Sequence, residues 1–265
     1  MIKLIASDLD GTLLQEGTAD IHPEIYEVIR ALQEAGVRFV AASGRNYESV
    51  MSIFGCMEKE ILMISDNGGY SVSGGQELYC CGFSKPLLKK ILDAARKIPD
   101  VWMMASAARC VYTDQNDPTY VNWIREGYKS DISIVADLLE IDEPLIKVAL
   151  YSYKRDAAVV AEELREQLGE EVEIVLSGER WIDMVMPNVS KGQALARIQE
   201  MLGISKAETA AFGDNGNDIP MLLQAEESYA VANAREETKA VAKYVIGDVS
   251  EHAVLTALKQ ILAEI

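Results

Sequence analysis

The sequence is poor in the residues that build disulfide scaffolds and zinc sites. Its 265 residues include only four cysteines and two histidines, His22 and His252. None of the cysteines forms a CxxC pair, and the adjacent Cys80 and Cys81 are poorly suited to an ordinary disulfide. We therefore expect reduced thiols and no zinc site.

Long apolar runs and positive charge are also scarce. No apolar segment approaches the roughly 20 residues that span a bilayer, and the opening MIKLIASD lacks the features of a secretory signal. Only 25 Lys and Arg face 42 Asp and Glu, so the formal net charge is −17. Such a chain is a poor partner for nucleic acid, because phosphate backbones are bound through Lys and Arg. We expect a cytoplasmic monomer or homodimer that binds neither membrane nor nucleic acid.

The chain has an ordinary globular composition, with 49% apolar and 25% charged residues. Apolar strands alternate with helices at both ends of the chain. Before residue 82 we expect strands at 3–7, 37–42 and 61–65 and helices at 23–35 and 47–54. After residue 190 the alternation returns, with a strand at 209–214 and a last helix at 251–264. Short apolar strands joined through helices predict a parallel sheet covered on both faces.

Residues 83–187 differ in character from the two ends. The runs VWMMAS (101–106) and RCVYTD (109–114) are separated by only a few residues, which predicts an antiparallel hairpin. Further strands are expected at 146–152, 172–176 and 181–186, and helices at 85–97, 120–127 and 156–168. We interpret 83–187 as an α+β module inserted into one α/β core that consists of residues 1–82 and 188–265.

Two acidic residues, Asp8 and Asp10, follow the first expected strand in the stretch ASDLDGTLL. On an extended backbone, residues i and i+2 point the same way. Two carboxylates so close repel one another unless a metal ion or a shared proton lies between them. Taken alone, the pair could also form a turn with a helix cap.

Polar residues also follow the other strands of the expected core. Ser43, Gly44 and Arg45 follow the second strand, Lys191 opens the helix after the insertion, and GDNGND (213–218) follows the strand at 209. Ligands of open parallel sheets bind at the carboxyl ends of the strands. We therefore expect these segments to meet at one edge of one sheet.

These residue types together suit phosphoryl transfer. Asp8 and Asp214, with a backbone carbonyl, supply the hard oxygen ligands that Mg²⁺ prefers. Ser43 and the backbone N–H groups after it can bind phosphate oxygens. Lys191 adds a positive charge where an anion would share the site. Asp10 is then left to act as acid and base.

Four motifs in this order resemble those of the haloacid dehalogenase superfamily: DLDGT (8–12), ASGR (42–45), NVSKG (188–192) and GDNGND (213–218). The large insertion between the second and third motifs is similar to that of the Cof-type phosphatases with a C2 cap, and DNGG (66–69) resembles an Asn-Gly turn of that subfamily. The resemblance covers essentially the whole chain. It implies a Rossmann-like, doubly wound parallel sheet with an inserted α+β cap.

The resemblance also implies roles for individual residues. Asp8 would be the nucleophile that forms an aspartyl-phosphate, Asp10 the acid and base, and Lys191 the group that offsets charge. The phosphate-binding residues would be Thr12, Ser43, Gly44, Lys191 and Asn217. Mg²⁺ would be held by Asp8, the main-chain oxygen of Asp10, and Asp214. Supporting residues would be Asp218, Asn215, Arg45 and Asn67, with Arg45 either an ion-pair residue or a substrate contact.

The expected function is hydrolysis of small phosphomonoesters such as sugar phosphates. The superfamily's dehalogenases lack the second acid, so Asp10 favours a phosphatase. Two alternatives remain at this point: a phosphomutase acting on sugar phosphates, and a non-catalytic protein that binds a phosphorylated metabolite, although a pure binder would not need Asp10.

Substrate selection is expected to lie in residues 83–187. Candidate contacts there are Arg109, Asn122, Lys147 and Trp181. We expect Trp181, Trp102 and Met103–Met104 to be core of the inserted module rather than a substrate platform. Asp183 could face either the cleft or solvent.

Overall fold

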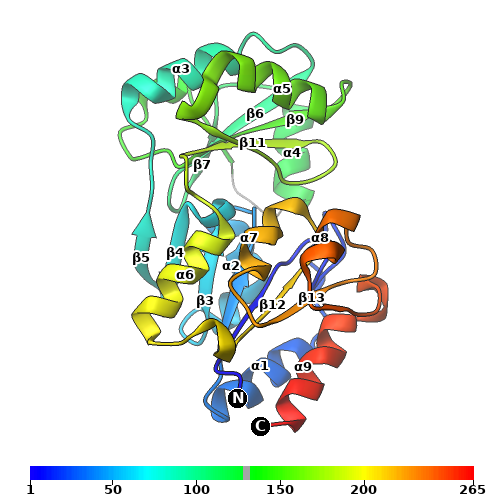
Figure 1. Cartoon of the computed structure of the whole chain (residues 1–265). Helices are drawn as coiled ribbons and strands as arrows, with labels where there is room; N and C mark the ends of the chain where they lie inside the picture. Colours follow the sequence, from blue (N-terminus) through cyan, green and yellow to red (C-terminus); the bar gives the residue numbers. More distant parts are fainter. Residues whose placement is uncertain (128–131) are drawn as a thin grey trace.

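The computed structural model describes residues 1–127 and 132–265, which form two sheets stacked in two tiers (Figure 1). The core sheet has eight strands: β1 (Leu4–Ser7), β2 (Arg38–Ala42), β3 (Leu62–Ser65), β4 (Tyr70–Ser73), β5 (Gln76–Cys80), β12 (Thr209–Gly213), β13 (Glu227–Ala230) and β14 (Tyr244–Val245). Its strand order is β14-β13-β12-β1-β2-β3-β4-β5. The first six strands of that order run parallel, as the sequence predicted.

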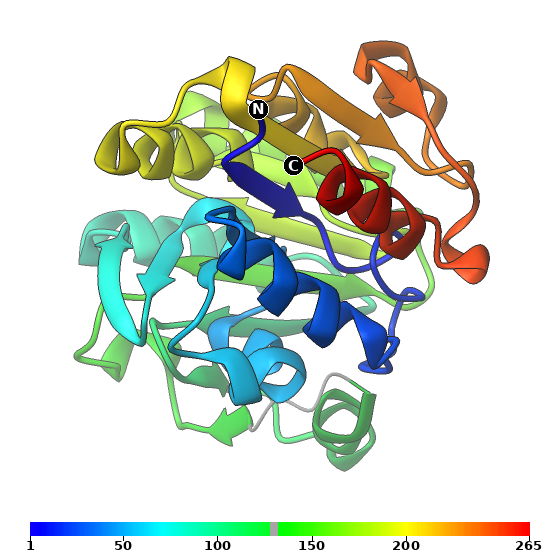
Figure 2. The ribbon, with the colours of Figure 1, turned by 90° about the horizontal axis from the view of Figure 1, so that it is seen from below.

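Helices cover both faces of the core sheet, which confirms the predicted doubly wound α/β fold. One face carries α1 (Glu24–Glu34), α2 (Tyr47–Phe54) and α9 (Ala253–Ala263), and the other carries α6 (Lys191–Leu202) and α7 (Ile219–Leu222). A further helix, α8 (Glu236–Val241), follows β13. Helices α1 and α9 lie side by side (Figure 2).

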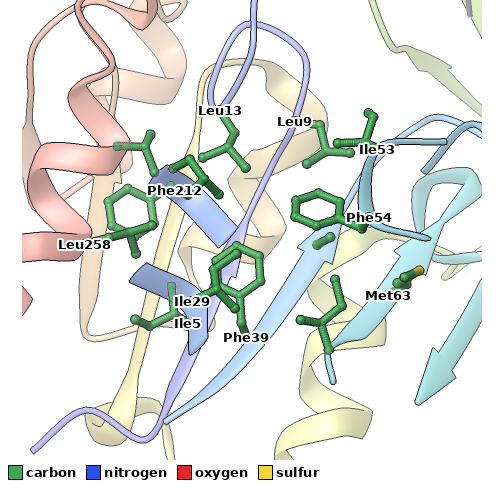
Figure 3. Packing of buried hydrophobic residues seen from close by; sticks show 14 of the residues in the cluster. Ile5, Leu9, Leu13, Ile29, Phe39, Ile53, Phe54, Met63, Phe212 and Leu258 are labelled. Carbon is green, nitrogen blue, oxygen red and sulfur yellow. The ribbon is translucent and has the colours of Figure 1, made fainter. Parts of the chain in front are cut away.

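Alternate residues of β1 serve the two faces. Ile5 packs with Ile29, Phe39 and Leu258 in the cluster on one face (Figure 3), whereas Leu4 joins the cluster on the other. Burial on both faces explains why this strand reads as a continuous apolar run. This burial also determines where β1 ends. Asp8 and Asp10 follow it and therefore lie at the edge of the core sheet that faces the second tier.

The sequence prediction missed the hairpin of β4 and β5, which extends the core sheet in the antiparallel direction. Gly74 and Gly75 form its turn with φ of 56° and 78°. Two adjacent glycines between alternating polar and apolar residues are a hairpin signal because both turn positions need positive φ. These glycines lie just before residue 82, where we expected the first core segment to end and the inserted module to begin.

The cap sheet has six strands: β6 (Val101–Ser106), β7 (Val111–Thr113), β8 (Ile132–Ile134), β9 (Lys147–Ser152), β10 (Glu173–Leu176) and β11 (Trp181–Val185). Its order is β10-β11-β9-β6-β7-β8. The predicted antiparallel pairing of β6 with β7 is confirmed. The sequence did not predict β8, which pairs with β7 in parallel.

The two faces of the cap sheet are covered unequally. Helices α3 (Lys85–Ala95) and α5 (Ala157–Leu168) pack on the outer face, away from the core sheet (Figure 1). Helix α4 (Pro118–Gly127) packs on the inner face around Met104, Ala149 and Trp181. The rest of that inner face meets the carboxyl ends of the core strands. Among the helices of residues 1–127 and 132–265, none combines the length and apolar character needed to cross a membrane.

Gly192 allows the first turn of α6 to pack directly against α7. A Cβ atom added at Gly192 would lie 2.3 Å from the carbonyl oxygen of Pro220. We expect Gly192→Ala to lower the free energy of unfolding in urea by about 2 kcal/mol, because the two backbones must separate. The control is Gly55→Ala, whose Cβ would meet only Met51 Cε at 3.7 Å; it should cost less than about 0.5 kcal/mol. Equal losses in the two variants would contradict this account of the α6–α7 contact.

Candidate active site

Four adjacent core strands end at one place beneath the cap sheet. The loops after β1, β2, β3 and β12 carry Asp8, Ser43, Asp66 and Asp214 respectively. Helix α6 begins beside them at Lys191, with the side chain of Ser190 accepting a hydrogen bond from the backbone N–H of Gln193 as its cap. The sheet topology therefore brings together the four sequence motifs, as expected from the carboxyl-end rule.

Lys191 lies at the centre of the site and is buried. Its Nζ donates to Oδ1 of Asp8 and, at 2.6 Å, to Oδ1 of Asp218. The exposed fractions are 1% for Lys191, 4% for Asp8 and 0% for Asp218. Burial alone would lower the pKa of Lys191, but the two carboxylates outweigh burial and raise it. The ammonium is therefore a permanent positive charge beside Asp8.

Asp218 holds the loop that carries Asp214. Its Oδ2 accepts hydrogen bonds of 3.0 Å from the backbone N–H groups of Asp214 and Asn215. The Asn215 side chain in turn accepts from the N–H of Gly216. Since both carboxylate oxygens of Asp218 are engaged, this residue orients the loop and Lys191, in keeping with its predicted supporting position.

Asp214 lies close to the loop after β1. Its Oδ1 accepts a 2.8 Å hydrogen bond from the hydroxyl of Thr12. Gly11 has φ of 80°, and a Cβ there would lie 2.5 Å from Oδ2 of Asp214. Only glycine fits this position, because it tolerates positive φ and leaves room for the carboxylate. The glycine of the DLDGT motif thus permits Asp214 to approach Asp8.

Asp8, Asp214 and Asp218 form a cluster in which one carboxylate oxygen of each lies within 4.8 Å of the others. Burial, the charge of Asp218 and that of Asp214 raise the pKa of Asp8 well above its usual value, with Lys191 opposing them. Burial and Asp218 likewise raise the pKa of Asp214 to about 7. Three carboxylates against one ammonium leave excess negative charge, and their oxygens are the donors a hard divalent cation takes. The residues present therefore fit a divalent metal.

Asp10 is paired with Arg45. The guanidinium donates from Nε to Oδ2 of Asp10 at 2.7 Å and from Nη2 to Oδ1 at 2.6 Å. Arg45 also donates to the carbonyl oxygen of Thr18 and to Ser49. The sequence left two interpretations of Arg45 open, an ion-pair residue or a substrate contact. The structure shows the ion pair with Asp10, and Arg45 also lines the pocket described next.

A pocket opens between the core sheet and the inner face of the cap sheet. Of the predicted site residues, its wall includes Asp8, Asp10, Gly44, Arg45, Lys191, Asp214, Asn215 and Asn217. The others lie behind this wall, and each contacts a residue in it: Thr12 binds Asp214, Ser43 accepts from the N–H of Arg45, Asn67 binds Asn217, and Asp218 binds Lys191. Direct phosphate contact by Thr12 and Ser43 stays a prediction.

The cap contributes a buried network that the sequence prediction found only in part. Lys147 Nζ donates to the carbonyl oxygen of Gly44 and lies 3.1 Å from Oδ1 of Asp66 and 3.6 Å from Oδ2 of Asp183. Asn67 donates to Oδ2 of Asp183 at 2.7 Å. Burial would lower the pKa of Lys147, but Asp183 and Asp66 outweigh it and raise that pKa. The network joins the cap sheet to the loops after β2 and β3.

Asp66 is the member of this network that the sequence prediction overlooked. It is fully buried, and burial raises its pKa although Lys147 opposes the shift. Its backbone and that of Asn67 are left-handed, with φ of 50° and 56°. The sequence could have identified Asp66 from its place directly after a core strand, because Asp8 and Asp214 also directly follow core strands.

The other cap candidates divide between the pocket and the surface. Trp181, Lys147 and Asp183 line the pocket. Asn122 is exposed, and Arg109 donates to the carbonyl oxygen of Gly75. Neither of these two is among the residues of the pocket wall within the described chain.

Comparison with known proteins identifies the family. The model of the haloacid dehalogenase-like hydrolases matches residues 5–258. The chain is 30% identical to the 5-amino-6-(5-phospho-D-ribitylamino)uracil phosphatase YbjI of Escherichia coli, over 98% of this chain and 96% of that protein. It is also 30% identical to the phosphatase YwpJ of Bacillus subtilis, over 98% and 100% of the two chains.

A solved structure agrees with these sequence matches. A haloacid dehalogenase-like hydrolase from B. subtilis superimposes with a TM-score of 0.85 at 28% identity, over 98% of this chain and 100% of that one. The resemblance inferred from the four motifs is thereby confirmed. The chain belongs to the haloacid dehalogenase-like hydrolase family and is an enzyme of its phosphatase group.

Proposed function

We propose that this phosphatase is Mg²⁺-dependent and hydrolyses small phosphomonoesters through an aspartyl-phosphate on Asp8. The observation that carries the proposal is the buried Lys191 bridge to Asp8, beside Asp214 and open to a pocket that Asp10 also lines. The phosphorylated substrate named for the E. coli relative supports a small metabolite ester. The relatives named as phosphatases do not favour the mutase or the non-catalytic binder.

In the first half of the proposed reaction, an Asp8 oxygen attacks phosphorus and the bond to the leaving oxygen breaks. Asp10 gives its proton to that oxygen, so the product leaves as an alcohol. Lys191 offsets the charge that gathers on Asp8 and the transferring group. Asp8 and Asp214, with the main-chain oxygen of Asp10, would hold Mg²⁺, which when bound neutralises negative charge on the phosphoryl oxygens.

In the second half, Asp10 takes a proton from water as the water oxygen attacks phosphorus. The phosphorus–Asp8 bond breaks, inorganic phosphate leaves, and both acids return to their starting states. The Arg45 pair suits this half, because its two hydrogen bonds hold the Asp10 side chain in one orientation.

We further propose residues 1–82 and 188–265 as the core domain and 83–187 as a cap that excludes bulk water from the phosphoryl-enzyme. Four free thiols agree with the proposed cytoplasmic location. A monomer or homodimer remains our proposal for the assembly.

Asp8→Asn tests the nucleophile. We expect phosphate release from metabolite phosphomonoesters to fall by at least about 10³-fold, because an amide does not attack phosphorus. The metal-free variant should unfold at a temperature equal to or above that of wild type, since a buried carboxylate with a raised pKa is replaced by a neutral isostere. EDTA should abolish wild-type release and Mg²⁺ should restore it. Near-normal turnover by Asp8→Asn would refute the assignment.

Asp10→Ala tests the acid–base role through the leaving group. With an alkyl phosphate we expect formation of the phosphoryl-enzyme to slow by about 10²-fold or more, because the alkoxide then leaves without a proton. With p-nitrophenyl phosphate this step should be far less affected, since p-nitrophenolate is a stable anion. Water attack still needs the base, so rapid-mixing measurements should show a burst of p-nitrophenolate. Equal slowing of this first step for both esters would contradict the role.

A further inference from the structure

A second pocket adjoins the active-site pocket described above. It is a groove between β10, the edge strand of the cap sheet, and residues 215–217 of the core. Lys191, Asn215 and Asn217 belong to the walls of both pockets. Asn67, whose Oδ1 accepts from Asn217 at 2.9 Å, also lies in the wall of the groove. One layer of side chains therefore separates the groove from the phosphoryl site at Asp8.

The two pockets carry opposite net charge. Within the described chain, the wall of the active-site pocket has five acidic residues against three basic ones. The wall of the groove has one acidic residue, Glu173, against three basic ones, Arg165, Lys191 and Arg235. An excess of positive charge is a local exception in a chain whose formal net charge is −17. We call this second pocket the basic groove, and its charge attracts anions.

Arg165 supplies donors on the cap side of the basic groove. Its Nη2 donates to the carbonyl oxygen of Ile174 at 2.8 Å, and its Nη1 donates to Glu162. A guanidinium has five N–H donors, so others are left for a ligand. The bond to Ile174 also shows that the carbonyl of this edge residue points away from the sheet. Because the N–H and C=O of one strand residue point to the same side, the Ile174 N–H points away from the sheet as well.

Arg235 supplies donors on the core side. Its backbone N–H donates to the carbonyl oxygen of Asp214 at 2.9 Å, which fixes its backbone to the loop of the active-site acid. Its side chain is 44% exposed, and Nη1 lies 4.0 Å from Oε1 of Glu237. An ion pair so long and so exposed contributes little free energy. The guanidinium can therefore turn toward an anion in the groove at small cost.

The donors of the basic groove suit phosphate. Guanidinium groups pair with phosphate oxygens through two parallel N–H bonds, and the groove has one guanidinium on each wall, with the Ile174 N–H beside Arg165. Inorganic phosphate forms in the adjoining active site. Resting on the phosphatase function proposed above, we propose that the basic groove is a second phosphate-binding site, which takes inorganic phosphate as it leaves Asp8.

An exit through the groove leaves the buried network between cap and core intact. To lift the cap sheet off the core, Lys147 must part from Asp66, and their side chains are only 3% and 0% exposed. Breaking a buried ion pair in this way is costly. On the way to the groove, the barrier is instead the hydrogen bond between Asn67 and Asn217. The alcohol and the phosphate therefore leave through different openings.

Inhibition by inorganic phosphate tests the second site. Phosphate bound only at the active site must compete with the ester, so it would raise KM and leave kcat unchanged. Phosphate in the basic groove binds while the active site is occupied, blocks the departing product and lowers kcat. We expect mixed inhibition of p-nitrophenyl phosphate hydrolysis by wild type, measured at constant ionic strength and constant free Mg²⁺. Purely competitive inhibition would overturn the proposal and leave the phosphatase function standing. If no phosphomonoester is hydrolysed, the phosphatase function itself fails.

The double variant Arg165→Gln, Arg235→Gln should make the inhibition competitive. We expect the phosphate concentration that halves kcat to rise about tenfold or more, because charged hydrogen bonds to the anion are lost. Without added phosphate, kcat/KM should stay within about twofold, since this quantity ends with departure of the alcohol. The control is Arg30→Gln, Arg155→Gln, which removes one core and one cap charge outside both pocket walls within the described chain. Equal loss of the effect on kcat in the control would mean that only net charge matters, and would refute the site.

Gly216→Leu tests the same site while both guanidinium groups stay in place. Gly216 lies in the wall of the basic groove, and a Cβ atom there would meet nothing within 4 Å. The leucine side chain would therefore occupy part of the groove. We expect phosphate to lose its effect on kcat in this variant too, while it still raises KM. An undiminished effect on kcat in both Gly216→Leu and the double variant would place the second phosphate elsewhere and overturn the proposal.

Discussion

The site depends on one buried ammonium that pairs with two carboxylates. Without Lys191, Asp8 and Asp218 would be two like charges almost completely out of water, a far costlier arrangement than any single polar burial. Because Asp218 also binds the backbone of the loop that carries Asp214, the same ammonium connects the first strand, the last motif and the start of α6. The close contact of α6 with α7 at Gly192 keeps the ammonium at this depth.

A second buried cation, Lys147, connects the cap to this arrangement. It reaches the carbonyl oxygen of Gly44 and the carboxylate of Asp66 on the core, while Asp183 on the cap pairs with it and accepts from Asn67. Asn67 accepts in turn from Asn217 in the pocket wall. A displacement of the cap sheet therefore changes the partners of residues beside the substrate. Selection in the cap and chemistry in the core share one set of hydrogen bonds.

The sequence predicted the parts of this structure that depend on local pattern. The buried run of β1 and the motif that opens at Asp8 predicted a strand end with acids, and the carboxyl-end rule brought Lys191 and Asp214 to it. β8 was missed because a strand of three residues carries a weak periodic signal. The β4–β5 hairpin has a turn signal at Gly74 and Gly75, but it lies beside the boundary expected near residue 82 and was not used. Lys147, Asp183 and Asn67 were candidates from the sequence, but their mutual contacts could not be predicted. Those contacts depend on how the two sheets face one another, which no local pattern encodes.

The active-site pocket carries its apolar residues on the cap side, and this division follows from the same topology. Residues at the ends of the core strands are polar because several loops place backbone and side-chain hydrogen-bond donors in one small volume. An apolar residue there would leave these donors without an acceptor. The inner face of an antiparallel cap sheet has no such requirement, so alternate positions can carry Trp181 and Met104. Changes at those positions alter the apolar end without touching the Lys191 bridge. A phosphatase built this way can change its leaving group through the cap while its phosphoryl chemistry stays fixed by the core.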